Sequence, residues 1–151
     1  MGTGRRLVPM NTIHDEVEAL LRRTRQRYTA GRRELVSHLV TLAGPATLGD
    51  LVDRGIGQSQ SSLYRNLAVL EQCGAVRRVS SVDDVNRFEL TETLTEHHHH
   101  LVCQQCGRID DVTLPPQLES SLHRAGGHID TKGFSVDGHR VELFGTCPEC
   151  A

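Results

Sequence analysis

Four of the five cysteines form two pairs with the same internal spacing. The pairs are Cys103-Gln104-Gln105-Cys106 and Cys147-Pro148-Glu149-Cys150, and 40 residues separate them. A C-x2-C turn offers two thiolates to one ion, and two such turns supply the four soft donors of a tetrahedral zinc site. No secretion signal accompanies them, so the pattern favours a closed structural Zn2+ site over disulfides. The fifth cysteine, Cys73, has no partner motif, and we interpret it as a small buried residue.

A run of four histidines, His97-His98-His99-His100, ends shortly before the first cysteine pair. If this segment is a strand, its side chains alternate between two faces. His98 and His100 then face one way and His97 and His99 the other, so one strand could serve two separate metal sites. Solvated histidines beside a zinc knuckle are the alternative interpretation.

Charge is divided unevenly along the 151 residues, although the net charge is only -2. Residues 1–80 contain 12 basic and 7 acidic side chains, a net of +5, whereas residues 81–151 contain 5 and 12, a net of -7. A basic part that suits a polyanion therefore precedes an acidic part that suits cations. No apolar run approaches the ~18 residues that cross a bilayer, and no signal-peptide pattern follows Met1. We expect a cytoplasmic protein.

The basic part contains several short helical patterns followed by a hairpin. Helical spacing of apolar residues begins near Ile13, Leu35, Leu48 and Leu63. The predicted N-caps are Asn11 or Thr12 for the first of these helices, Thr29 for the second and Thr47 for the third. A fourth helix is predicted over 59–72, and 75–79 and 87–90 form two strands. This order predicts a winged helix-turn-helix, in which helix 59–72 enters the DNA major groove.

Polar residues at the start of helix 59–72 are suited to contacts with DNA. Ser61, Ser62, Tyr64 and Arg65 have the lengths and donors that reach base edges and phosphates. Arginines at positions 22, 23, 25, 27, 32 and 33 precede this motif and could neutralise phosphates. A solvated basic face is the alternative for the arginines, but the whole combination favours double-stranded DNA as the partner.

Together these motifs resemble the ferric uptake regulator (Fur) family of bacterial metal-responsive repressors, over roughly residues 20–150. The similar segments are Tyr64-Arg65-x-Leu67, Phe88-Glu89-Leu90, His98-His99-His100-Leu101-Val102-Cys103-x2-Cys106-Gly107 and Gly145-x-Cys147-x2-Cys150. The resemblance implies an α+β fold, with an N-terminal winged helix-turn-helix domain over 1–92, of which 1–12 are flexible. A small α/β dimerisation domain with the four-cysteine zinc site then covers 93–151. It also implies a homodimer that binds a palindromic operator when loaded with a divalent metal.

The resemblance also implies sets of site residues. The structural zinc ligands are Cys103, Cys106, Cys147 and Cys150. The regulatory site at the hinge comprises Glu89, His98 and His100, with Asp111 or Asp110 completing the shell. A second metal site in the dimerisation domain comprises His97, His99, Glu119 and His139. The DNA-binding residues are Arg27, Ser61, Ser62, Tyr64 and Arg65.

Two departures from the family pattern leave the regulatory metal open. Iron- and peroxide-responsive members take a hinge ligand from a histidine between the second and third helices, where this chain has Gly44-Pro45-Ala46-Thr47. Zinc-responsive members use an aspartate after the recognition helix and a cysteine at the end of the wing, where this chain has Arg77 and Thr91. The expected cofactors are therefore structural Zn2+ and a regulatory Fe2+ or Zn2+, with Mn2+ and Ni2+ as further candidates.

The function expected from the sequence is metal-dependent repression of metal homeostasis genes, without enzyme activity. One alternative is a peroxide sensor of the same fold, in which a metal-bound histidine is oxidised. Another is a zinc hydrolase, against which the lack of an H-E-x-x-H pattern counts. A third is a small zinc-ribbon adaptor with no role at DNA.

Overall fold

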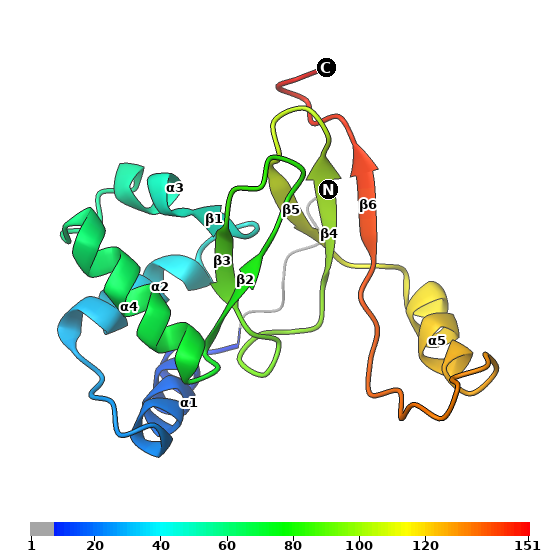
Figure 1. The fold of residues 1–151 in the computed structure, drawn as a ribbon, viewed down its shortest axis with the longest axis horizontal. Coiled ribbons are helices and arrows are strands. Elements are labelled where there is room, and N and C mark those ends of the chain that lie inside the picture. Colours follow the sequence, from blue (N-terminus) through cyan, green and yellow to red (C-terminus); the bar gives the residue numbers. More distant parts are fainter. Residues whose placement is uncertain (1–7) are drawn as a thin grey trace.

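The computed structural model describes residues 8–151, whose elements divide between a helical half with one sheet and a second half built on another sheet (Figure 1). The first half contains α1 (Met10–Arg23), α2 (Ala30–Val40), β1 (Ala46–Thr47), α3 (Leu48–Asp53), α4 (Gln60–Gln72), β2 (Val76–Val79) and β3 (Arg87–Leu90). The second half contains β4 (His99–Cys103), β5 (Ile109–Val112), α5 (Pro116–Ala125) and β6 (Glu142–Gly145).

The helices of the first half start where polar side chains cap exposed backbone N–H groups. Thr29 accepts from the Arg32 N–H, and Thr47 forms a reciprocal capping box with Asp50. Ser59 caps α4 by accepting from the Ser62 N–H. The predicted caps at Thr29 and Thr47 are therefore confirmed.

The predicted start of the first helix is wrong. Helix α1 begins at Met10 after Pro9, whose carbonyl accepts from the Ile13 N–H, so Asn11 and Thr12 lie inside the helix and do not cap it. The cause is the fixed φ of proline, which suits the residue before a helix. Of the segment expected to be flexible, residues 10–12 are helical, and residues 1–7 lie outside the described part of the chain.

The first sheet has the order β1-β3-β2, with both pairs antiparallel. Strands β2 and β3 form the predicted hairpin, with Val76 opposite Leu90 and Val79 opposite Arg87. Strand β1, two residues long, was not predicted because it is too short to show an alternating pattern. The α1–α4 helices enclose a leucine-rich core against this sheet, and Cys73 is buried in it, as the sequence predicted.

The second sheet has the order β5-β4-β6, with β4 antiparallel to β5 and parallel to β6. A parallel pair needs a crossover connection, which α5 and the loops around it provide. The register places Cys103 beside Gly145, so the residues after β6 emerge next to the first cysteine pair. This pairing determines where the four cysteines meet.

The two halves contact each other away from the covalent link. The Asp111 N–H donates to the Ala43 carbonyl at 2.7 Å, and Ser81 Oγ donates to the Gly107 carbonyl at 2.7 Å. A Cβ on Gly44 would lie 2.3 Å from the Ile109 carbonyl oxygen, so the loop after α2 packs directly on β5. The predicted domain boundary after residue 92 falls in the segment between β3 and β4 and stays a prediction. Within residues 8–151, no helix has the length and apolar character needed to span a bilayer.

Candidate metal centres and DNA-binding surface

The four paired cysteines converge on one point. Cys103 ends β4, Cys106 lies in the turn beyond it, and Cys147 and Cys150 follow β6. Their sulfurs all lie within 4.8 Å of one another, and the Cys106 and Cys147 sulfurs are 3.8 Å apart. Tetrahedral Zn–S bonds of about 2.3 Å place sulfurs about 3.8 Å apart, whereas a disulfide needs about 2.05 Å. All five cysteines are free thiols, and this donor set fits zinc.

Backbone N–H groups favour thiolate at the centre of this cluster. Hydrogen bonds from the backbone N–H groups of Cys106 and Cys147 lower the pKa of Cys103 to about 6. The neighbouring sulfur of Cys147 has the opposite effect on Cys150, whose pKa is raised to about 12. Negative charge on one sulfur thus opposes ionisation of the next, and a bound cation would relieve that opposition.

A second cluster joins the two halves at the hinge. Glu89 comes from β3, His98 directly precedes β4, His100 lies in β4, and Asp111 comes from β5. The Glu89 Oε2 atom lies 3.2 Å from the Nε2 atoms of both histidines, and Asp111 Oδ1 lies 3.6 Å from Nε2 of His98. The side chains of Glu89, His98 and His100 are almost fully buried. Asp110, the sequence alternative to Asp111, instead forms an ion pair with Arg108.

Hydrogen bonds at the hinge prepare His98 to bind a cation. Its Nδ1–H donates to the Glu96 carbonyl at 2.9 Å, which leaves Nε2 with a lone pair when the ring is neutral. Burial opposes ionisation of Glu89, but its contacts with His100, His98 and Arg77 outweigh that effect, so the pKa of this carboxyl is lowered. His100 Nδ1 is buried without a hydrogen-bond partner in residues 8–151. The donor set of two imidazoles and two carboxylates fits a divalent transition metal.

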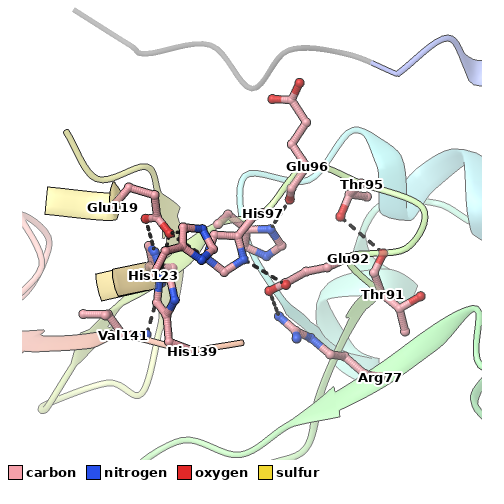
Figure 2. Close-up of polar contacts among 12 residues, drawn as sticks. Arg77, Thr91, Glu92, Thr95, Glu96, His97, Glu119, His123, His139 and Val141 are labelled. Atoms are coloured by element: carbon pink, nitrogen blue, oxygen red, sulfur yellow. Dashed lines mark hydrogen bonds and ion pairs between the residues drawn. The ribbon is translucent and has the colours of Figure 1, made fainter. Parts of the chain in front are cut away.

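Arg77 on β2 links the hinge cluster to its surroundings. Its Nε donates to Glu89 Oε1, and its Nη2 donates to Glu92 Oε1 at 3.3 Å. Glu92 in turn contacts Nδ1 of His97 through its other oxygen at 3.0 Å (Figure 2). Arg77 therefore holds one oxygen of Glu89, and the second oxygen faces the two hinge histidines.

The third cluster lies between β4, α5 and the segment before β6. It contains His97, His99, Glu119 and His139, whose donor atoms lie within 4.8 Å of one another. Figure 2 shows Glu119 facing the rings of His97 and His139, together with His123, which lies one turn further along α5. The structure thus brings the three predicted ligand sets together in three separate clusters, and the histidines that lead into β4 and begin it alternate between two of them.

The predicted DNA-binding residues lie at the exposed start of α4. Tyr64 is 56% exposed, Ser61 and Arg65 are exposed, and Arg65 Nη2 donates to Ser62 Oγ at 3.3 Å. Arg27 is also exposed. One of the arginines expected to meet phosphates, Arg32, donates hydrogen bonds within the protein, to the Arg27 carbonyl and to Oδ1 of Asn66.

Comparison with known proteins decides the family. The family model described as "Ferric uptake regulator family" matches residues 23–144. The chain belongs to the ferric uptake regulator family. It is 31% identical over 144 residues to the peroxide operon regulator of Bacillus subtilis, covering 91% of this chain and 94% of that protein. This relative is a transcriptional regulator.

Solved structures of Fur-family proteins share the fold. The Helicobacter pylori ferric uptake regulator, described as having three functional metal-binding sites, matches with a TM-score of 0.72 at 22% identity, over 98% of this chain and 97% of that one. A zinc uptake regulator in complex with zinc and DNA matches with a TM-score of 0.54 at 20% identity, over 95% of each chain. The predicted α+β fold and the predicted metal-dependent Fur-family repressor are confirmed at this level.

Three side chains around the Fur-family clusters were missed by the sequence analysis as parts of a site. Arg77 and Glu92 were missed because their role depends on a β2–β3 register that brings them to the hinge. His123 was missed as a site residue although a signal existed, because Glu119 and His123 are four residues apart on one helix and so share a face.

Proposed function

We propose that the hinge cluster is the metal-responsive switch of this repressor. The observation that carries the proposal is the convergence of Glu89, from the winged-helix half, with His98, His100 and Asp111, from the second half. A divalent cation bound there would supply positive charge that both halves share. Residues 1–92 would then act as the DNA-binding domain and residues 93–151 as the dimerisation domain, in the cytoplasm. The third cluster would bind a further ion, and the cysteine cluster a structural zinc.

The side chains at the hinge control the angle between the halves. His98 presents Nε2 because its Nδ1–H is held by the Glu96 carbonyl, and Glu89 is held by Arg77 on the neighbouring strand. Drawing Glu89 toward the two histidines fixes β3 relative to β4. In a dimer, this selects the orientation in which both α4 helices fit two half-sites of a palindromic operator. By linkage, operator DNA should tighten metal binding by the same factor.

Exposed apolar side chains on the second sheet support the homodimer. Leu101 and Leu143 are neighbours in the β4–β6 register and are 43% and 47% exposed, and Phe144 is 56% exposed. All four residues of β6 are exposed, so this strand offers both its apolar side chains and its edge. Such a surface suits association with a second copy of the chain.

A more specific function, peroxide sensing, is favoured by the similarity to the peroxide operon regulator. The hinge cluster contains imidazoles and carboxylates without sulfur, a donor set that suits Fe2+. In that case peroxide should add one oxygen atom to His98 or His100 in the iron-loaded protein. Mass spectrometry of peptides containing these residues distinguishes sensing by oxidation from simple metal response, in which no oxygen is added.

Electrophoretic mobility shift with buffered metal tests the switch. The DNA probe is the promoter of this chain's own gene. The metal-free protein is titrated separately with Zn2+, Fe2+, Mn2+ and Ni2+ in its presence. His98→Ala combined with His100→Ala should abolish metal-stimulated binding but retain the zinc held by the cysteines. His128→Ala, which changes an exposed histidine beyond α5, is the matched control. Unaltered metal response in the double variant would place the switch elsewhere.

The DNA arm of the same experiment uses Arg65→Ala. Loss of this side chain should cost about 1–3 kcal/mol of operator binding, with the metal content unchanged. Unchanged operator affinity would show that α4 is not the recognition helix.

A further inference from the structure

The predicted DNA-binding surface comes from two segments that are far apart in the sequence. Arg27 lies in the connection between α1 and α2, whereas Tyr64 and Arg65 lie near the start of α4. All three residues are exposed. A helix fixes its own residues relative to one another, but only tertiary contacts can fix the α1–α2 connection relative to α4. The side chains that make these contacts therefore decide whether both segments can meet one DNA duplex together.

The guanidinium of Arg32, on α2, bridges the two segments. Its Nη1 donates to the Arg27 carbonyl, and its Nε donates to Oδ1 of Asn66 on α4 at 3.3 Å. Arg32 is half-buried, whereas the arginines at positions 22, 23, 25, 27 and 33 are exposed. A planar guanidinium serves two acceptors at once because its donors form a fixed fork. Arg32 thus ties the backbone of the α1–α2 connection to α4.

Asn66 continues this chain of hydrogen bonds back to α2. Its Nδ2 donates to Gln58 Oε1 at 2.7 Å. Gln58, in the loop before α4, donates from Nε2 to the Gly31 carbonyl at 2.8 Å and to Glu34 Oε2 at 3.0 Å. A Cβ on Gly31 would lie 3.1 Å from Gln58 Oε1 and 3.3 Å from Asn66 Nδ2, so the two helices approach closely here. The first turn of α2 is therefore held against α4 from both ends of the chain.

Only one arrangement of the two amides satisfies this chain. Arg32 at one end can only donate, and the carboxylate of Glu34 at the other end can only accept. Asn66 must therefore turn its oxygen to Arg32 and its nitrogen to Gln58. Hydrogen bonds from Gln58 and from the Gly57 N–H lower the pKa of Glu34, which keeps this end of the chain negative. A fully satisfied polar network of this kind specifies one relative position of the elements that it joins.

We propose that Arg32 and Asn66 are positioning residues for DNA binding, which hold Arg27 in register with the start of α4. This proposal rests on the proposed role of α4 at the operator. Neither positioning residue contacts DNA, because the hydrogen bonds of both are made within the protein. With the link intact, Arg27 meets a phosphate while Tyr64 and Arg65 meet the major groove. Less ordering is then required when the operator binds.

The salt dependence of operator binding tests the link. The full-length, metal-loaded protein is titrated onto a fluorescent promoter fragment of its own gene between about 50 and 200 mM salt. Asn66→Ala should weaken binding about 10-fold, which is typical of losing a hydrogen bond to a charged group. It should also lower the salt slope by up to about one phosphate contact, as Arg27→Ala does, although asparagine carries no charge.

Val69→Ala is the matched control for Asn66→Ala. It truncates another half-buried residue of α4 and should change neither the affinity nor the salt slope. Circular dichroism and zinc content check that each variant is folded. An Asn66→Ala variant with the salt slope of the unmodified protein would show that Arg27 keeps its phosphate without the link, and would overturn the proposal.

Two further variants separate positioning from charge and from stability. Arg32→Lys keeps the positive charge but cannot serve both acceptors, so it should weaken binding as Asn66→Ala does. Retained affinity in Arg32→Lys would mean that Arg32 acts through its charge alone. In an Arg27→Ala background, Asn66→Ala should cost less than about 3-fold, because the side chain that it positions is absent. Equal losses in both backgrounds would show that Asn66 acts through the stability of the fold.

Arg65→Ala distinguishes failure of this proposal from failure of the proposed function. If Arg65→Ala weakens operator binding while Asn66→Ala and Arg32→Lys bind as the unmodified protein does, α4 is the recognition helix and the positioning proposal fails alone. If Arg65→Ala also leaves the affinity unchanged, α4 is not the recognition helix and both proposals fail.

Discussion

The two halves of the molecule are stabilised by different means. The winged-helix half buries a continuous core of leucine, valine and isoleucine from all four of its helices. In the second half the buried apolar cluster consists of Val102 and Ile109, completed by Val79 from the wing. Strand β6 is exposed along its length, and α5 buries no residue. Side chains with metal-ligating groups occupy the positions where a core would be expected, including the buried His99 and His100.

This difference shows how the charge division of the sequence is realised in the structure. An ordinary core leaves the surface of the first half free for basic side chains that meet DNA. A half held by metal ligands must contain many carboxylates, histidines and cysteines, and its negative charge follows from that. The stability of the second half should therefore depend on metal, while the stability of the first should depend on apolar packing.

The largest effect should come from Cys103→Ser. Loss of this buried ligand should release the structural zinc, whose binding contributes on the order of 10 kcal/mol in small zinc domains. Hydrogen exchange should then show β4, β5 and β6 losing protection, with α2 and α4 remaining protected. Serine at the exposed Cys106 tests the same site from its solvent side. Retained zinc and retained protection in both variants would mean that the cysteines do not hold the second half together.

An intermediate effect is expected from Leu67→Ala in the first half. Leu67 is 1% exposed on α4, and its truncation should destabilise the winged helix by about 2–5 kcal/mol through lost burial and a cavity. Chemical denaturation measures the change, and the metal content should not alter. If zinc were lost together with the leucine core, the two halves would not be stabilised independently.

The sequence predicted most of the fold because its signals are local. Thr47 and Ser59 begin helices by capping neighbouring N–H groups, and alternation alone divided His97 and His99 from His98 and His100. Features that depend on contacts between residues far apart in the sequence could be found only from the structure. The close approach of Gly44 to Ile109 packs the loop after α2 directly on β5, and no local pattern in the sequence indicated this contact. The role of Arg77 likewise depends on strand register, because the β2–β3 pairing brings it to Glu89.

The smallest effect concerns the contact between the halves at the tip of the wing, where Asp83 binds both terminal nitrogens of Arg87 at 2.8 Å beside Gly107. Hydrogen bonds from Arg87 lower the pKa of Asp83 from 3.8 to about 2. A depressed pKa stabilises the folded state above the unfolded value, and this stabilisation disappears as the pH falls from about 4 to about 2. Because the Asp83 side chain is 30% exposed, we expect only about 1 kcal/mol.

Asp83→Asn should therefore lower the free energy of unfolding by about 1 kcal/mol at pH 7, and the difference from the unmodified protein should shrink below pH 4. Denaturant titrations of both proteins between pH 2.5 and 7 measure it. Asp84→Asn is the matched control, because it changes the exposed carboxylate next to Asp83 in the chain. A constant difference across this pH range would show that Asp83 acts through packing against Gly107 and not through its charge.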